Sequence, residues 1–295
     1  MTLLQVLILA VLQGAAELLP VSSSAHVIVA EKLMHLDPST PEAMFVLAML
    51  HTGTMFAVLI YFWGAWRRSY FSSAERFWSV AKKVVLATAI TGIVGYLGLV
   101  HFIEHHWLRR PAGTGVLAGA PAHGDIEELS RNTPLLAGAL AAAGVLIIIA
   151  GLARKAPAAG EDEAQVGTGA AAWMGLAQAI CLPFRGLSRS GTTISTGLLA
   201  GSPRRAAEEF SFALVIVLTP FVIGREFLRL KRAYPAAWHS GAFAHLMTPG
   251  LIGLILSFLA GLAALRWLSA WLEQGRWHYF GYYCVAFAVF VLAVP

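Results

Sequence analysis

Charged side chains are scarce in this 295-residue sequence, at 13% of all residues. Soluble globular domains carry about 25% charged residues, so this chain has too little polar material to cover a water-facing surface. Hydrophobic residues make up 58% of the sequence and gather in long blocks, which a soluble core does not need. The composition therefore excludes a soluble globular protein and predicts an integral membrane protein in contact with membrane lipids.

Cysteine is also rare, and its two positions exclude two common kinds of site. Cys181 and Cys284 lie in apolar surroundings and give neither a metal-site spacing nor a disulfide framework. The first 20 residues lack a basic segment, and polar Gln13 and Glu17 follow the apolar run, so we expect no cleavable signal peptide. The excess of 21 Lys and Arg over 16 Asp and Glu is typical of cytoplasmic loops in membrane proteins and does not indicate nucleic-acid binding.

Apolar stretches near membrane-spanning length predict an all-α fold with six transmembrane helices. They cover residues 43–63, 84–103, 134–153, 209–230, 246–268 and 278–294. Two further apolar stretches, 3–19 and 169–182, run into proline and serine and are followed by short apolar pieces at 25–36 and 191–201. Each pair indicates a re-entrant helix hairpin, because nonhelical backbone at this depth must be buried in protein or line a cavity.

The predicted order is one hairpin and three transmembrane helices, twice over, within a single polytopic domain covering residues 1–295. The halves cover about 1–153 and 169–295 and are joined by a linker at 154–168. Three spans is an odd number, so the second half must lie upside down relative to the first. Inverted repeats with broken helices place a binding site where the two breaks meet.

Loop charges predict the orientation of the chain in the membrane. The loop 64–83 holds five Lys and Arg against one Glu, and such loops stay in the cytoplasm. Alternation along the chain then makes the linker 154–168 cytoplasmic and puts the first hairpin on the outer side. Four basic residues between positions 225 and 232 fall on the outer side in this arrangement, against the rule, unless they extend a helix and reach the lipid headgroups.

The first polar break offers a carboxylate, hydroxyls and an imidazole. Gln13 and Glu17 are four residues apart and share a helix face, and a carboxylate in an apolar stretch usually faces a cavity with a partner. Ser22 and Ser23 lie four and three residues before His26, so hydroxyl and imidazole can share a face. The serines are also good N-caps for the next helix, whose start offers free N–H groups to an anion.

The second polar break, Arg185–Thr193, is rich in hydroxyls and arginine. Ser188 or Ser190 can cap a helix, on which Arg189 and Thr193 then share a face. Arginine is permanently charged and suits bidentate contact with phosphate. With hydroxyls and backbone N–H groups at a helix start, it forms a phosphate cradle. A positively charged loop at the membrane edge is the alternative interpretation.

A histidine inside an expected span adds one open question. His51 lies in the stretch 43–63, where it either lines the cavity or bonds a neighbouring helix.

Both breaks carry a resemblance to a known family. The chain resembles the bacterial undecaprenyl-pyrophosphate phosphatase family of the bacitracin-resistance membrane type, over nearly its whole length. The matching residues of the first motif are Gln13, Glu17, Leu19, Pro20, Ser22, Ser23 and His26, and the second motif is Arg185–Thr193. Arg185 stands where the family pattern has proline, and Gln13 stands where it more often has glutamate. These departures leave open the backbone shape before Gly186 and the ligands of a metal.

The resemblance implies an acid-anhydride hydrolase that converts undecaprenyl pyrophosphate to undecaprenyl phosphate and inorganic phosphate. This reaction recycles the carrier lipid for peptidoglycan synthesis and confers bacitracin resistance. The resemblance also implies a multi-pass protein of the bacterial plasma (inner) membrane whose site faces the extracytoplasmic side and works with a divalent cation, Mg²⁺ or Ca²⁺. The implied partners are the polyprenyl pyrophosphate lipid and membrane lipids, and a homodimer is compatible with the sequence.

We assign the residue roles as a hypothesis. Ser23 attacks the terminal phosphorus and His26 is general base and then acid, with His26 as the nucleophile itself as the alternative. Glu17, with Gln13, positions a metal or orients His26. The pyrophosphate is expected to be held by Arg189 together with Ser22, Gly186, Ser188, Ser190 and Thr193. The rival function is a polyprenyl-phosphate lipid flippase or transporter, since inverted repeats and broken helices are typical of transporters.

Overall fold

The structure of the chain is a computed structural model that describes residues 1–37, 40–106, 108, 129, 132–153, 165–235 and 242–294. Most of the predicted linker 154–168 therefore lies outside the described residues.

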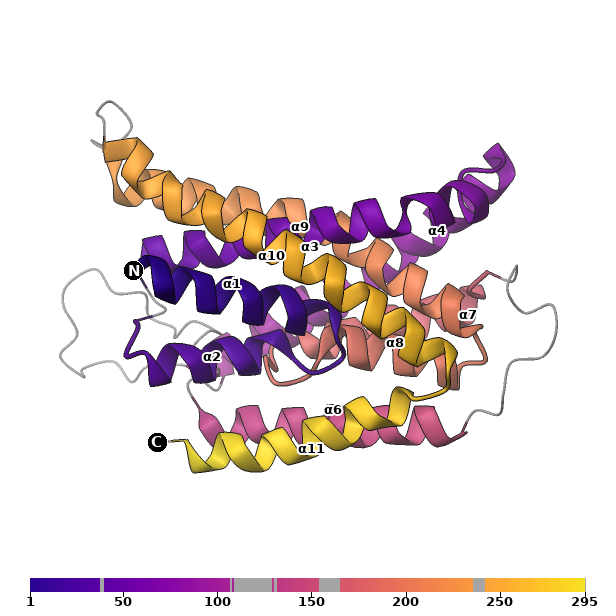
Figure 1. Ribbon diagram of the computed structural model, residues 1–295. Helices are drawn as coiled ribbons and strands as arrows, with labels where there is room; N and C mark the ends of the chain where they lie inside the picture. Colours follow the sequence, from indigo (N-terminus) through magenta and orange to yellow (C-terminus); the bar gives the residue numbers. More distant parts are fainter. Residues whose placement is uncertain are drawn as a thin grey trace.

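Helices account for the regular structure of the described residues, which confirms the all-α prediction (Figure 1). The first half of the chain forms α1 (Leu3–Leu18), α2 (Ser23–Leu33), α3 (Pro41–Ser69), α4 (Ala74–Ile90), the π-helical stretch η1 (Thr91–Val100), α5 (His101–His106) and α6 (Thr133–Ala153). The second half forms α7 (Thr168–Cys181), α8 (Arg189–Leu199), α9 (Arg204–Ala233), α10 (Ala242–Glu273) and α11 (Trp277–Ala293).

Four helices are long and apolar enough to cross a membrane. They are Glu42–Ser69, Ala74–His106, Thr133–Ala153 and Met247–Glu273, and α1 and α11 are shorter apolar helices. Large apolar side chains lie exposed on these helices, among them Trp63, Leu97, Leu251 and Val289. Exposed apolar surface on this scale suits lipid and not water, so the chain is a multi-pass membrane protein. The predicted spans in α9 and α11 are not among the four and stay predictions.

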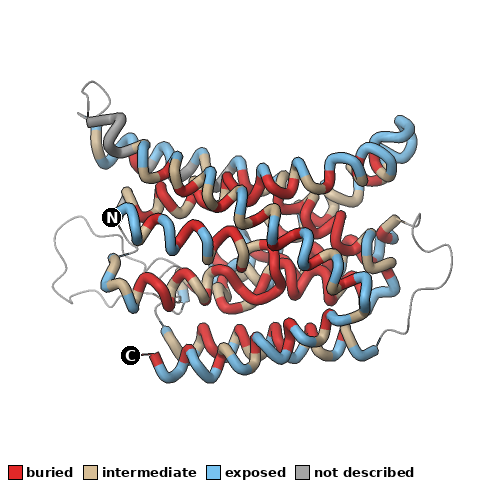
Figure 2. The backbone as a smooth tube through the Cα atoms, in the orientation of Figure 1, coloured by how far each residue is buried: buried red, intermediate tan, exposed pale blue. Residues whose placement is uncertain are grey.

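The two helix pairs next to the polar breaks come together in the middle of the molecule. In Figure 1, α1 and α2 lie toward the left and α7 and α8 toward the right, and the turn of each pair points to the centre. Around them α1 packs against α10, α7 against α4 and η1, α3 against α9 and α10, and α6 against α11. Buried residues concentrate where the pairs meet (Figure 2), so the breaks lie in the protein interior, as backbone without helical hydrogen bonds requires.

The helices next to the breaks begin and end where the sequence predicts. α1 ends at Leu18, two residues before Pro20, and α7 ends at Cys181, two residues before Pro183, because proline cannot continue a helix. Ser22 and Ser188 then cap the next helices, each accepting a backbone N–H from three residues later, at 3.4 and 3.2 Å. Ser22 does so in the left-handed region, at φ 64°.

The packing of α6 on α11 depends on two facing glycines. A Cβ atom on Gly144 would lie 2.8 Å from the carbonyl oxygen of Gly281, and one on Gly281 would lie 2.5 Å from that of Gly144. Small residues let membrane helices approach this closely. The obstructing atoms belong to the backbone, so a rotamer change cannot relieve the contact.

We expect Gly144→Ala to destabilise the fold by about 1–3 kcal/mol, because the added methyl group forces the two backbones apart. Gly138 lies on the same helix with nothing within 4 Å of its Cβ position. Gly138→Ala should therefore leave stability unchanged or raise it by about 1 kcal/mol. Thermal unfolding of the purified variants in detergent measures both effects, and equal midpoints for the two would contradict the close approach.

Candidate active site

The carboxylate of Glu17, in the last turn of α1, is the centre of the site. Its side chain is only 8% exposed. Oε2 accepts hydrogen bonds from Ser23 Oγ at 2.5 Å and from Gln13 Nε2 at 2.9 Å, and Oε1 accepts one from Arg189 Nη2. A buried carboxylate is very costly unless it is paired and hydrogen-bonded. These three donors supply that compensation, so the two breaks meet at a charged pair.

His51 of α3 is a further partner of the same carboxylate. Its Nε2 lies 3.5 Å from Glu17 Oε2, and its Nδ1 lies 2.8 Å from the Leu47 carbonyl oxygen. A carbonyl only accepts, so Nδ1 carries a hydrogen, and Nε2 can donate to Glu17 only in the doubly protonated ring. The prediction that His51 contacts a neighbouring helix is confirmed, because Glu17 belongs to α1. That His51 lines a cavity stays a prediction.

Two reciprocal hydrogen bonds join the breaks. Ser22 Oγ donates to the Arg185 carbonyl at 3.1 Å, and Ser190 Oγ donates to the Leu19 carbonyl at 3.3 Å. Each serine thus satisfies a carbonyl in the nonhelical backbone of the opposite break. An unsatisfied backbone group inside a membrane costs several kcal/mol, so these bonds stabilise both turns against each other.

The N-termini of α2 and α8 both begin at this junction. Their first turns start at Ser23 and Arg189, the two residues bonded to Glu17. The first N–H groups of a helix lack intrahelical partners, and the helix dipole adds positive potential there. The N-termini of α2 and α8 and the Arg189 side chain lie at this junction, and together they suit the binding of an anion such as phosphate.

His26 points to a different neighbour from the one we expected. Its Nδ1 lies 2.8 Å from the Ser22 carbonyl oxygen and its Nε2 lies 2.7 Å from the Tyr283 hydroxyl. Its ring stacks on Phe287, with 4.0 Å between centroids and 9° between planes. Ser23 directs its hydroxyl to Glu17. In this structure, therefore, Glu17 and not His26 is the group placed to take the Ser23 proton.

Three of the predicted phosphate ligands make structural contacts that support the backbone of the site. Ser188 caps α8 and is 2% exposed. Thr193 is fully buried, and its hydroxyl bonds the Arg189 carbonyl at 2.7 Å and Ser211 of α9 at 2.6 Å. A Cβ atom on Gly186 would lie 2.2 Å from the Leu136 carbonyl oxygen of α6, so a glycine allows this turn to approach α6.

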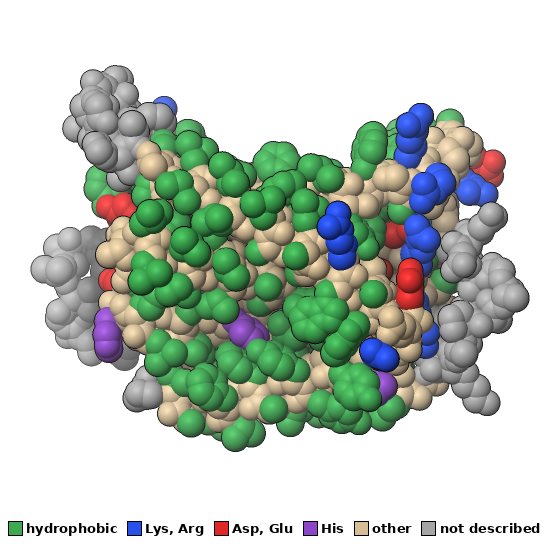
Figure 3. Space-filling model, viewed as in Figure 1, with side chains coloured by type: hydrophobic (Ala, Val, Ile, Leu, Met, Phe, Trp, Pro, Cys, Tyr) green, Lys and Arg blue, Asp and Glu red, His purple; other side chains and the backbone are tan. Residues whose placement is uncertain are grey.

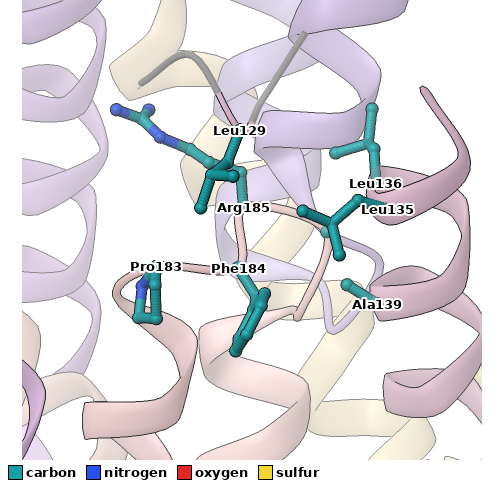
Figure 4. Close-up of a pocket in the computed structure, with 8 residues that line it drawn as sticks. Leu129, Leu135, Leu136, Ala139, Pro183, Phe184 and Arg185 are labelled. Atoms are coloured by element: carbon teal, nitrogen blue, oxygen red, sulfur yellow. The ribbon is translucent and has the colours of Figure 1, made fainter. Parts of the chain in front are cut away.

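A small hollow lies on the α6 side of the second break (Figure 4). Its lining residues are Leu129, Leu135, Leu136, Ala139, Pro183, Phe184, Arg185 and Gly186. Figure 4 shows the guanidinium group of Arg185 pointing away from Leu135 and Ala139. The hollow itself is apolar and does not suit a phosphate group.

The polar side chains around Glu17 are too few to bind a hard divalent cation unless the substrate supplies further ligands. Within the described ranges, no three His, Cys, Asp or Glu side chains come together as a metal-binding group. One carboxylate with the Gln13 amide and the Ser23 hydroxyl is a set of the kind that holds Mg²⁺ when phosphate oxygens and water supply the remaining ligands.

Tyr283 is the site residue that sequence reasoning missed. It lies in an aromatic segment of α11, His278-Tyr-Phe-Gly-Tyr-Tyr283, where nothing in the pattern distinguishes one tyrosine from another. His51 did carry a signal, since a histidine inside a spanning segment usually has a partner.

Comparison with known proteins gives matches over nearly the whole chain. The family model described as bacitracin resistance protein BacA matches residues 6–290. Undecaprenyl-diphosphatase 2 of Acinetobacter baylyi is 52% identical over 297 residues, which is 100% of this chain and 98% of that protein. The undecaprenyl-diphosphatase of Korarchaeum cryptofilum is 33% identical over all of both chains, and that of Rhodopirellula baltica is 31% identical over 98% of this chain and 97% of the relative.

We expect Arg189→Gln to destabilise the protein by about 3 kcal/mol, because it leaves the buried Glu17 carboxylate without its permanent counter-charge. Adding Glu17→Gln should recover a large part of that loss, since the double variant buries no unpaired charge. Thermal unfolding in detergent of wild type, both single variants and the double variant measures the coupling. Strictly additive effects would show that the ion pair does not hold the breaks together.

Proposed function

The chain belongs to the bacitracin resistance protein family, BacA, and from that membership and the site geometry we propose that it is an undecaprenyl-diphosphatase. It hydrolyses undecaprenyl pyrophosphate to undecaprenyl phosphate and inorganic phosphate, which recycles the carrier lipid for cell-wall synthesis and confers resistance to bacitracin. One observation carries the proposal: a buried carboxylate bonded at once to a serine hydroxyl and to an arginine, where two helices begin. Phosphoryl transfer depends mainly on such positioning and charge neutralisation.

In the first half-reaction, Ser23 Oγ attacks the terminal phosphorus. The bond from this phosphorus to the bridging oxygen breaks, undecaprenyl phosphate leaves, and Glu17 Oε2 takes the Ser23 proton. The 2.5 Å hydrogen bond between the two side chains supports this assignment. Arg189 moves from Glu17 to the phosphate oxygens, where its planar donors fit, and the N–H groups of the two helix starts bind the remaining oxygens.

In the second half-reaction, a water molecule attacks the phosphoserine. His26 takes a proton from the water, the bond from phosphorus to Ser23 Oγ breaks, and inorganic phosphate leaves. Ser23 Oγ regains a proton from Glu17, and His26 releases its proton to the solvent. This role fits a ring whose Nδ1 is bonded to a backbone carbonyl, because Nε2 is then the basic nitrogen. His26 as the nucleophile remains the alternative that a trapped intermediate distinguishes.

A divalent cation, Mg²⁺ or Ca²⁺, fits the same site. Glu17 and the Gln13 amide would hold it together with phosphate oxygens of the substrate, and it would neutralise charge on the phosphates when bound. Ser22 and Ser190 keep the two breaks in register, and Ser188, Thr193 and Gly186 support α8 and its turn from behind.

We propose that the two halves are inverted repeats, each with a re-entrant hairpin. The pairing of corresponding helices, α3 with α9 and α6 with α11, supports a two-fold relation, as do the reciprocal serine bonds. The hairpins enter from opposite ends in Figure 1.

Lys and Arg side chains gather at the right end of the face shown in Figure 3. Basic ends stay in the cytoplasm, which supports a first hairpin and a site open to the extracytoplasmic side of the bacterial inner membrane.

Ser23→Ala is expected to lower phosphate release from undecaprenyl pyrophosphate by at least about 100-fold, because it removes the nucleophile. Ser24→Ala, one position further along, is the matched control and should stay near the wild-type rate. Purified protein in detergent is the right sample, since phosphate release needs no second compartment, whereas transport does. Full turnover by Ser23→Ala would disprove the assigned nucleophile, and a wild type without phosphatase activity would favour the flippase or transporter.

Two additions to this assay separate the remaining alternatives. A phosphoenzyme trapped by rapid quenching and mapped by mass spectrometry distinguishes Ser23 from His26 as the residue that carries the phosphoryl group. Chelator treatment followed by addition of Mg²⁺ or Ca²⁺ tests the cation, and we expect activity to fall and then return.

Substituted cysteines test the orientation. We expect Asn132→Cys, at the start of α6, to react with a membrane-impermeant maleimide in intact cells. Glu75→Cys, at the start of α4, should react only after permeabilisation, because its basic loop faces the cytoplasm. Both positions are exposed, and the background should lack Cys181 and Cys284. The reverse labelling pattern would overturn the proposed orientation.

A further inference from the structure

Helix α11 forms one wall of the first break through three side chains. The Tyr283 hydroxyl lies 2.7 Å from His26 Nε2, Phe287 stacks on the His26 ring at 4.0 Å, and Cys284 Sγ donates to the Pro20 carbonyl at 3.3 Å. His26 and Tyr283 are 257 positions apart in the chain, so the two ends of the sequence meet at this ring. The reaction scheme above gives Tyr283 no role.

The contacts of His26 determine which ring nitrogen is basic. The Ser22 carbonyl at Nδ1 can only accept, so Nδ1 carries the hydrogen in the neutral ring. Nε2 then has a lone pair, and the Tyr283 hydroxyl donates to it. The near-parallel Phe287 ring, at 9°, fixes the plane. Tautomer and orientation of His26 are thus both held from outside the ring.

A tyrosine hydroxyl keeps this contact through a proton transfer. It donates one hydrogen and also accepts. A water molecule next to the hydroxyl can give a proton to the tyrosine oxygen while the tyrosine hydrogen passes to Nε2, so the imidazole takes up a proton without moving. Once Nε2 has taken a proton, the imidazolium N–H donates to the same tyrosine oxygen. A phenylalanine at this position would keep the ring contacts but could do neither.

We propose that Tyr283 is a positioning residue for the phosphatase reaction. It acts through His26: its hydroxyl donates to the basic Nε2, which the Ser22 carbonyl leaves without a hydrogen, and accepts from the imidazolium that forms when water attacks the phosphoserine. The proposal rests on the proposed function, because the role of His26 does. It extends the site to α11, the last helix of the chain.

The kinetic test compares two neighbouring tyrosines on α11. Tyr283→Phe should lower kcat about tenfold with KM nearly unchanged, since one hydrogen bond to a group that becomes charged is lost. Tyr282→Phe is the matched control, because the two residues are similarly exposed, at 48% for Tyr282 and 46% for Tyr283. It should stay within about twofold of wild type. In a His26→Gln background, Tyr283→Phe should have no further effect on residual turnover.

A spectroscopic test reads the tautomer directly. In ¹⁵N-histidine-labelled protein, the His26 signals are those missing from His26→Gln. Wild type should show the Nδ1–H tautomer with a hydrogen-bonded Nε2, and Tyr283→Phe should shift the Nε2 resonance while Tyr282→Phe does not. The tautomer itself is read from wild type, and the His26→Gln sample serves only to assign the signals.

The outcomes separate the two proposals. A wild type without phosphatase activity sinks the proposed function, while the ¹⁵N signature still reports whether Tyr283 holds the ring. An Nε2–H tautomer in wild type overturns the role of Tyr283, as does a wild-type kcat in Tyr283→Phe. Equal losses of kcat in the two phenylalanine variants, or an undiminished Tyr283→Phe effect in the His26→Gln background, show a merely structural role and overturn it as well.

Discussion

The carboxylate of Glu17 and the guanidinium of Arg189 come from positions 172 residues apart and meet inside the protein. Glu17 without Arg189 would be strongly destabilising, because a buried charge that has lost its partner is not compensated. The pair therefore links the C-terminal end of α1 to the N-terminal end of α8. Around the pair, Gln13 and Ser23 add donors to Glu17. Ser22 and Ser190 hold the backbone of the two breaks.

Nonhelical backbone is the second constraint, and it explains why the site is built where helices stop. Pro20 and Pro183 end two apolar helices inside the protein, which leaves carbonyl and N–H groups without partners. Hydroxyls of Ser22 and Ser190 bond the carbonyls, and an anionic substrate can bond the N–H groups. In the proposed function, the N–H groups left without partners at the two helix starts are the groups that bind phosphate. The same feature solves a structural problem and creates a binding site.

The sequence alone predicts the helices and the centre of the site because both depend on local properties. Apolar run length gives four of the six predicted spans, and proline and serine give the breaks. The spacing of Gln13 and Glu17 places both on one face, as their 2.9 Å hydrogen bond confirms. The second break was predicted as a cationic phosphate cradle, and in the structure its Arg189 pairs with Glu17. The proposal of inverted halves comes from the odd number of spans, which is also a property of the sequence.

What could not be predicted is the direction in which each side chain points. Ser23 and His26 are three positions apart and can share a face, yet the hydroxyl turns to Glu17 and the imidazole to Tyr283. The reason is the competition among partners: a carboxylate is a stronger acceptor than a neutral imidazole, and α11, at the far end of the chain, brings a ring and a hydroxyl to His26. Spacing along a helix limits which groups can meet. The partners brought by distant helices then decide which of those meetings occur, and here they separate the serine from the histidine and give each its own proton acceptor or donor.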